Sequence, residues 1–295
     1  MEAIKQDIKV INKVSAKEKM KAYFRNPVSL ILFLLVVAAA VVTFVVLAFL
    51  IGYILIKGVP HLTPSLFAFQ YNTENVSLVP ALINTITMTF FSLLIAAPLG
   101  IFSAIYLVEY AKRGNKFIGV IRITAETLSG IPSIVYGLFG MLFFVTALHW
   151  SYSIMAGAFT LAIMILPLIM RTTEEALKAV PDSFREGSFG LGAGKLRTVF
   201  VIVLPTAVPG ILAGVILGIG RIVGETAALI YTAGTAPNVP ENLMGSGRTL
   251  AVHMYALSSE GLYMNQAYAT AVVLLIIVVV INTLSGYIAK KIAAR

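Results

Sequence analysis

Residues 185–205, REGSFGLGAGKLRTVFVIVLP, form the stretch that indicates how this chain is folded. The stretch lies between two apolar segments, and glycines interrupt its first half, which predicts a turn over residues 185–192. A helix is expected from Gly194 towards Leu204-Pro205. The sequence therefore predicts a helix–turn–helix whose two ends return to the same apolar layer.

The residues just before this stretch supply the first part of the motif. Thr172–Val180 is predicted to be a short helix that ends at Pro181, and Asp182 or Ser183 can cap the helix that follows. Apolar side chains near the turn favour a docking element over a solvated loop, because exposed aromatic pairs rarely serve a bare loop. These side chains are Phe184, Phe189 and Leu191.

The composition of the whole chain shows what surrounds this motif. Of its 295 residues, 59% are hydrophobic and 12% are charged, whereas a soluble domain has about 25% charged residues. So few charges cannot cover a water-exposed surface, which excludes a soluble enzyme and makes lipid the solvent. The chain has no cysteine, and its three histidines have no spacing typical of a metal site. We expect neither a metal nor another cofactor.

Six stretches are long and apolar enough to cross a bilayer, for which about 20 residues are needed. The first is too long for a signal-peptide core and too far from the N-terminus, so we predict a retained helix. The expected organisation is an all-α membrane protein with a basic segment at 1–27, a first helix at 28–56 and a membrane domain at 80–289. The predicted spans are Val28–Ile56, Pro80–Val108, Phe117–Leu148, Ile154–Met170, Ala207–Tyr231 and Ala267–Ile288.

Basic residues predict the orientation of these spans. The chain has 22 basic and 13 acidic residues, a formal net charge of +9, and cytoplasmic loops collect Lys and Arg. Eighteen basic residues fall on one side of the predicted membrane, against Lys57 and Arg248 on the other. Both termini are therefore predicted to be cytoplasmic, and we expect no nucleic-acid partner. The outer stretches Lys57–Val79 and Thr232–Gln266 are too short for a folded domain, so a separate protein would have to bind an extracytoplasmic substrate.

Two arginines fall within predicted spans, each four residues before a glutamate. Arg122 precedes Glu126 in the third span, and Arg221 precedes Glu225 in the fifth. This spacing puts each pair on one helix face within ion-pairing reach. Charges at membrane depth are costly and therefore suggest a function, although each pair is alternatively a self-neutralised structural strut.

Small residues accompany both pairs. Ser129 and Ser133 belong to the segment ETLSGIPS, whose glycine and proline suggest a kinked helix that faces a pore. Gly210, Gly214 and Gly218 recur every four residues, a pattern of close helix packing in membranes. At about 100° per residue, the Arg221 pair continues this packed face. A guanidinium offers a donor fork that matches tetrahedral oxyanions, so we predict a transient anion contact there.

The spacing within residues 186–205 resembles the cytoplasmic EAA loop of ABC-importer permeases. That loop runs Glu-Ala-Ala, three residues, glycine, nine residues, then Ile-x-Leu-Pro, and this chain keeps every spacing but has Gly and Ser for the two alanines. The resemblance implies docking on a separate ATPase, and Gly194-Lys195 fails the phosphate-loop pattern, so this chain is not expected to be an enzyme. The residues to which the coupling role is carried over are Glu186, Gly187, Ser188, Gly192, Leu204 and Pro205.

Three further segments resemble the permeases of phosphate-specific ABC importers. They are Arg221–Leu229, RIVGETAAL; Glu126–Gly137, ETLSGIPSIVYG; and Ala97–Ala111, APLGIFSAIYLVEYA. From Pro80 onwards the chain is identified as a member of that family, of the PstA type. The residues assigned to an anion pathway are Arg221, Glu225, Arg122, Glu126, Ser129 and Ser133.

This resemblance implies a fold, a function and a set of partners. The expected fold is that of type I importer permeases, and the expected function is uptake of inorganic phosphate across a bacterial or archaeal cytoplasmic membrane. The expected partners are a PstC-type second permease, an ATPase dimer and an extracytoplasmic phosphate-binding protein.

Three alternative functions remain at this stage. The chain could carry another oxyanion such as molybdate, tungstate or sulfate, which the coupling loop does not distinguish. A membrane enzyme acting on lipid phosphates would need clustered acid–base or metal ligands, and Glu109, Glu174 and Glu175 form no such set in the sequence. A stand-alone channel or secondary carrier would not need a loop for an ATPase.

Overall fold

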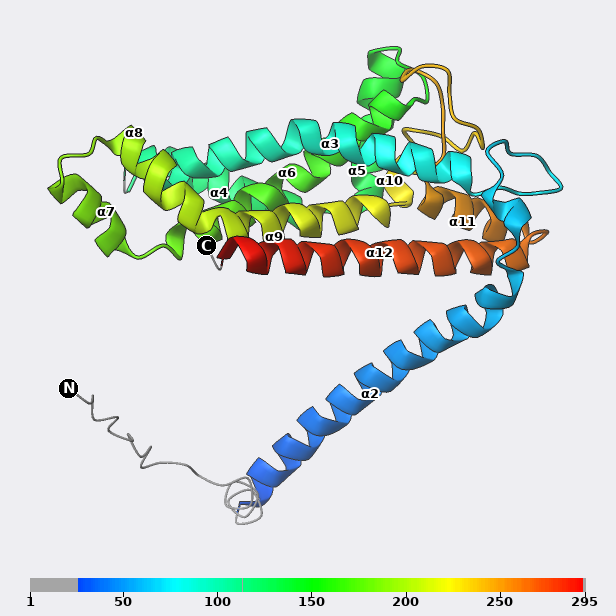
Figure 1. Cartoon of the computed structure of the whole chain (residues 1–295), viewed down its shortest axis with the longest axis horizontal. Helices are drawn as coiled ribbons and strands as arrows, with labels where there is room; N and C mark the ends of the chain where they lie inside the picture. The colour runs from blue at the N-terminus through cyan, green and yellow to red at the C-terminus, as the bar shows by residue number, and fades with distance from the viewer. Residues whose placement is uncertain (1–25, 113, 294–295) are drawn as a thin grey trace, which may run out of the picture. The chain divides into compact units, whose positions relative to one another are not determined.

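The computed structural model describes residues 26–112 and 114–293, whose regular elements are all helices (Figure 1). The chain divides after Ile54 into two units. The first unit contains most of α2 (Pro27–Gly58), an apolar helix that matches the first predicted span. Its residues are apolar all along the helix, as expected of a segment that crosses a membrane. Most of the predicted basic segment 1–27 lies outside the described residues.

Four helical stretches of the second unit are each long and apolar enough to cross a membrane within the described ranges. They confirm the predicted second, fourth and sixth spans and, with different ends, the fifth. They are α3 (Val79–Ile105) continued by η3 (Tyr106–Tyr110); α6 (Ile154–Lys178); α8 (Lys195–Thr198), η5 (Val199–Val203) and α9 (Leu204–Val223) in succession; and α12 (Met264–Ala293).

The third predicted span is not one helix. It consists of α4 (Lys116–Ser129), α5 (Ser133–Gly140) and η4 (Met141–Ala147), and the chain bends by 100° between the first two. The bend lies at Gly130–Pro132, because Pro132 cannot donate a backbone hydrogen bond and forces the preceding residue out of the helical region. The predicted kink is confirmed, and six spans are reached only if this bent pair counts as one.

The fifth predicted span, Ala207–Tyr231, has different limits in the structure. Its helix already begins at Lys195, and it ends at Val223, where Gly224 stops the regular hydrogen bonding. The chain then turns into the short helix α10 (Ala227–Ile230). The glycine-rich helix therefore ends before the Glu-Thr-Ala part of the motif.

The helix–turn–helix of residues 172–205 is confirmed, with two corrections. Thr172–Val180 is not a separate helix, because α6 continues through this region to Lys178. Glycines do not break residues 185–190, which lie within α7 (Asp182–Gly190). The turn comes after that helix, at Gly192, whose φ of +82° is a conformation that glycine adopts without strain.

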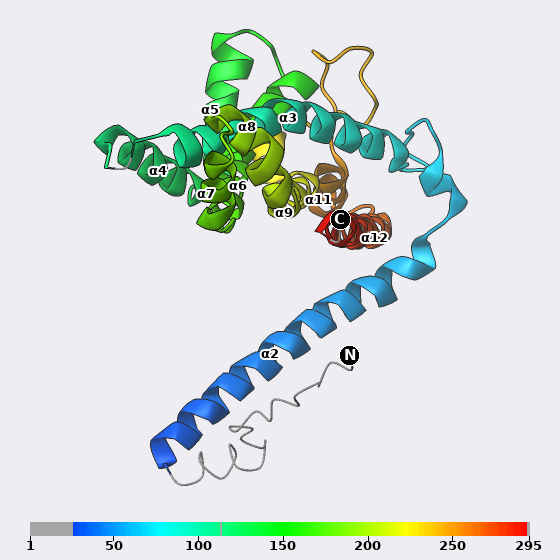
Figure 2. The same cartoon turned by 60° about the vertical axis from the view of Figure 1, so that its left-hand side comes forward.

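The core lies where α3, α6 and α9 pack together, and α12 packs along α9 (Figures 1 and 2). Ser92 of α3 donates a hydrogen bond to the Ala158 carbonyl of α6 over 3.0 Å. Such contacts satisfy polar groups that lipid cannot. At the end of the unit opposite α7, α11 (Leu250–Glu260) packs against α12.

Candidate functional site

The helix α7 is fixed to the rest of the unit by one arginine. The Arg185 guanidinium pairs with the Glu109 carboxylate in η3, which continues α3, with Nη2 2.7 Å from Oε1. It also donates to the carbonyls of Leu177 (3.0 Å), in the last turn of α6, and Val180 (2.8 Å), just after that helix. Both charged side chains are largely buried, at 14% and 8% exposed. Arg185 therefore joins α7, α3 and α6 at a single point.

The residues expected to couple to an ATPase lie on and after α7. Glu186 is exposed, and open space surrounds the backbone at Gly187 and Gly192. Ser188 is buried, and its hydroxyl lies 2.8 Å from that of Thr198, which ties α7 to α8. Leu204 and Pro205 are the first residues of α9, directly after η5 in the same continuous helical stretch.

An exposed apolar surface accompanies these residues. Leu191 is 91% exposed, and Phe184 and Phe189 remain about half exposed although they flank a turn between helices. Exposed apolar side chains of this size, close together in sequence, indicate an interaction with another protein or with the membrane. The structure thus presents α7 as a rigidly anchored, apolar-tipped projection.

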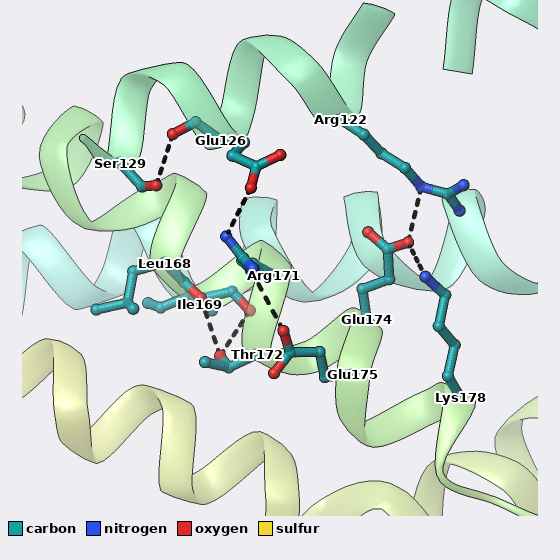
Figure 3. A network of polar contacts seen from close by, with 10 residues as sticks. All are labelled: Arg122, Glu126, Ser129, Leu168, Ile169, Arg171, Thr172, Glu174, Glu175 and Lys178. Carbon is teal, nitrogen blue, oxygen red and sulfur yellow. Dashed lines mark hydrogen bonds and ion pairs between the residues drawn. The ribbon is translucent and has the colours of Figure 1, made fainter. Parts of the chain in front are cut away.

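The Arg122–Glu126 pair predicted from the sequence does not form. Instead the Arg122 Nε lies 2.7 Å from Glu174 of α6, and the same carboxylate lies 2.6 Å from Lys178 (Figure 3). Glu174 is 8% exposed, and a desolvated carboxylate is stabilised most by two nearby cations. Arg122 and Glu126 lie on the same helix, but Arg122 pairs with the buried carboxylate of α6 instead.

Glu126 and the two serines also lie in this region. Glu126 pairs with Arg171 at 3.5 Å, and Arg171 pairs with Glu175 at 3.3 Å, all well exposed (Figure 3). Ser129 donates to the Glu126 carbonyl at the end of α4, and Ser133 is the first residue of α5. These exposed pairs contribute little stability.

A cavity of about 210 Å³ lies between α4 and α6, over these charges. Three cations face three carboxylates there, so the cavity carries no excess positive charge for an anion. The arrangement is that of a strut between two helices. The lining side chains are Arg122, Ala125, Glu126, Met170, Arg171, Glu174, Glu175 and Lys178.

The second predicted pair, Arg221 and Glu225, is not formed either. Since α9 ends at Val223, Glu225 is no longer on its face, and the Glu225 carboxylate instead accepts a hydrogen bond from the Ala228 amide at the start of α10 (3.1 Å). Arg221 is half-buried in the last turn of α9. It has no carboxylate within ion-pairing distance among the described residues. Its guanidinium acts electrostatically on the hydroxyl of Tyr136 in α5.

Two helix breaks meet beside Arg221. The α4–α5 bend and the α9–α10 turn are held together because α5 packs on α10. A Cβ at Gly137 would lie 2.7 Å from the Ala228 Cα, so only glycine allows this approach. Tyr136 donates to the Leu128 carbonyl near the bend, over 2.7 Å. Interrupted helices at membrane depth are tolerated where they are buried in protein or line a water-filled path.

The glycine repeat packs as predicted at two of its three positions. A side chain at Gly210 would lie 2.7 Å from the Ala176 Cβ, and one at Gly214 would overlap the Thr172 hydroxyl. Gly218 is buried, but a Cβ there would meet Ile169 only at an ordinary 3.8 Å. The close contact of α9 with α6 therefore runs from Gly210 to Gly214.

Several residues of these sites had no signal in the sequence. Arg185 and Glu109 are 76 residues apart, and Arg122 and Glu174 are on different helices. At the opposite end, Arg248 is 5% exposed and its guanidinium lies 4.9 Å from the Tyr71 ring centre. His253 is fully buried nearby, with its pKa lowered to about 3 by burial and by the Arg248 charge. No periodicity rule relates any of these partners.

Comparisons with known proteins agree with this architecture. Residues 96–295 match the family model of the binding-protein-dependent transport system inner membrane component. The chain is 36% identical over 277 residues to a probable ABC transporter permease protein, YqgI, of Bacillus subtilis, covering 85% of this chain and 92% of that protein. It is 34% identical over 211 residues to the phosphate transport system permease protein PstA 1 of Mycobacterium tuberculosis, covering 70% of this chain and 69% of that protein.

A solved structure shares the fold at low sequence identity. A chain of a bacterial alginate ABC transporter superposes with a TM-score of 0.65 at 14% identity, covering 92% of this chain and 98% of that one. The family match spans more than half of the chain and includes the α7 projection, the broken third span and the Arg221 region. The chain therefore belongs to the binding-protein-dependent inner membrane components, the permease subunits of ABC transporters, and is a multi-pass protein of the cell membrane.

Proposed function

We propose that this permease moves inorganic phosphate into the cytoplasm. The observation that carries the proposal is Arg221, a half-buried guanidinium without a carboxylate partner in the described part of the chain, at the point where two helix breaks meet. Relatives that are named phosphate transport permeases, such as PstA 1, support the choice of ion.

Arg221 has the properties that a transient phosphate contact needs. A guanidinium stays charged at any physiological pH and presents paired donors to tetrahedral oxyanions. A cation already neutralised by a buried carboxylate, as Arg122 is by Glu174, would attract an anion less. Glu225 supports the site indirectly, because its carboxylate holds the start of α10 in place. Four further residues remain proposed members of the pathway, with less support than Arg221: Arg122, Glu126 and Ser129 in α4, and Ser133 at the start of α5.

We propose the partners from the family of the chain and from two features of its structure. One chain supplies a single Arg221, which cannot surround an oxyanion, so we propose a path between this permease and a second, PstC-type permease. The α7 projection, with its exposed apolar tip, fits a cleft on an ATPase dimer, which supplies the energy. A separate phosphate-binding protein delivers the ion from outside, and both termini of this chain lie in the cytoplasm.

The test is ATP-dependent uptake of radiolabelled phosphate by the complete transporter in liposomes. Arg221→Gln should abolish uptake while the complex still assembles, and Arg221→Lys should retain little activity because a point charge does not reproduce the fork. Lys116→Gln is the matched control, since this exposed cation has no ion pair among the described residues. Normal uptake by Arg221→Gln would reject the proposal.

The same liposomes decide among the oxyanions. An excess of unlabelled phosphate should suppress uptake, whereas molybdate, tungstate and sulfate should not. Stronger competition by one of these ions would assign the transporter to that ion instead. Uptake without ATP would favour a channel or a secondary carrier.

A further inference from the structure

A second and larger cavity, of about 820 Å³, lies beside α7 and α8, where η3 at the end of α3 approaches the start of α4. Lys112, Gly114 and Asn115 line it on the connection between these helices, and Arg185 and Lys195 line it from α7 and α8. The described lining holds five basic and two acidic residues. The basic residues are Lys112, Arg122, Lys178, Arg185 and Lys195, and the acidic ones are Glu109 and Asp182.

Ion pairs account for only some of this positive charge. Arg122 and Lys178 share the carboxylate of Glu174, and Arg185 is paired with Glu109. Lys112 and Lys195 have no carboxylate within ion-pairing distance in the described part of the chain. Lys195 instead lies 5.1 Å from the ring centre of Tyr110, which orients its ammonium without neutralising it. The cavity therefore has an excess of positive charge, unlike the balanced cavity between α4 and α6.

An exposed apolar stripe leads away from this cavity along α4. Phe117, Val120 and Ile123 are 58–69% exposed and recur every three residues, so they share one face of the helix. Asn115, which lines the cavity, also caps the start of α4 by accepting from the Phe117 amide over 3.0 Å. Cations next to an apolar stripe on a membrane helix mark the level of the lipid headgroups.

We propose that this cavity binds the headgroup of an anionic phospholipid, whose acyl chains lie along Phe117, Val120 and Ile123. Basic pockets between membrane helices bind such headgroups through the phosphate group, which Lys112 and Lys195 would contact. The bound headgroup would lie beside the Arg185–Glu109 pair that fixes α7, so lipid composition would affect how firmly the coupling helix is held. The inference does not depend on which ion the transporter carries.

The complete transporter is incorporated into nanodiscs of equimolar phosphatidylglycerol and phosphatidylcholine and then released from them. Native mass spectrometry measures which lipid the released transporter retains. Removal of each lysine is expected to weaken phosphatidylglycerol binding about fivefold, and Lys112→Gln with Lys195→Gln about thirtyfold. The matched control, Lys116→Gln with Arg197→Gln, removes two exposed charges that do not line the cavity. The charge-conserving Lys112→Arg with Lys195→Arg variant should retain the lipid, which separates loss of charge from misfolding.

The alternative source of the same chemistry is free phosphate. Binding of free phosphate is tested by equilibrium dialysis of radiolabelled inorganic phosphate against the transporter in phosphatidylcholine alone. Every variant in this experiment also carries Arg221→Gln, which removes the proposed transport contact with phosphate. Selective loss of phosphatidylglycerol from the lysine variant, with no phosphate retained in the dialysis, supports the lipid site. Equal lipid retention by the lysine variant and the control overturns it, as does phosphate binding that disappears with the two lysines.

Discussion

Replacing Glu109 with Gln should release α7 from the membrane domain without unfolding that domain. The substitution leaves Arg185, only 14% exposed, without its main counter-charge. Breaking one member of a buried ion pair costs about 3–5 kcal/mol. Because α7 has only nine residues and few other anchors, the lost free energy weakens the attachment of α7 and does not unfold the membrane domain. The fraction of molecules with α7 detached should rise about a hundredfold to several thousandfold.

The assay is hydrogen–deuterium exchange of the α7 amides in the purified transporter, combined with ATP-dependent uptake. Exchange in α7 should accelerate and uptake should fall, while exchange in α3, α6 and α9 stays slow. Asp182→Asn is the matched control, because Asp182 also pairs with Arg185, at 3.2 Å, but is 72% exposed. An exposed pair of this kind contributes less than about 1 kcal/mol, so this variant should behave like the unchanged protein.

A double substitution separates the loss of the ion pair from the loss of packing. Glu109→Leu with Arg185→Met removes both buried charges, and such replacements are often neutral. The α7 amides of the double variant should therefore exchange almost as slowly as those of the unchanged protein. A small increase in rate is expected because the two hydrogen bonds from Arg185 to backbone carbonyls are also lost. If Glu109→Gln exchanged α7 as slowly as Asp182→Asn, Arg185 would not anchor the helix and the reasoning would fail.

Three further predictions concern packing, pH and topology. Gly214→Ala should destabilise the complex by about 1–3 kcal/mol in a thermal-unfolding measurement, because the added methyl group would overlap α6. The control is Gly220→Ala on the same helix, where the Cβ position is open, and this variant should be neutral or stabilising in the same measurement. Burial and the Arg248 charge lower the pKa of His253 from 6.5 to about 3, so between these values the unfolded chain binds a proton that the folded chain does not, and stability should fall as the pH falls. His253→Phe should flatten that acid limb, and an unchanged limb would exclude this histidine as its cause. A reporter fused after Arg295 should behave as cytoplasmic, and an extracytoplasmic signal would overturn the proposed orientation.

Much of the fold could be predicted from the sequence because its cues are local. A span requires about 20 apolar residues in succession, whatever the rest of the chain does, and α2, α3, α6 and α12 appear where these runs lie. Pro132 interrupts a helix through its own ring and missing donor, so the kink was also predictable. The glycine at 192 marks the turn between α7 and α8 for the same local reason.

The sequence was less informative about where the fifth span ends. A period of 100° per residue places Glu225 beside Arg221 only if the helix continues past Val223. In the structure α9 stops at Gly224, and α10 packs on α5 through the contact at Gly137. Gly224 is a local signal for the end of the helix, but the packing of α10 on α5 brings together two segments far apart in the chain, and no window along the sequence contains both.

Local patterns along the chain are therefore enough to predict a multi-pass helical membrane protein with a projecting helix–turn–helix and charges at membrane depth. The tertiary structure decided which charges are paired. Glu174 draws Arg122 away from its helical neighbour, Arg185 finds Glu109 across 76 residues, and Arg221 is left without a carboxylate among the described residues. The physical reason is that ion pairing depends on distance and desolvation in three dimensions. Spacing along a helix sets which partners are within reach, but the buried carboxylates contributed by other helices determine which partner is taken.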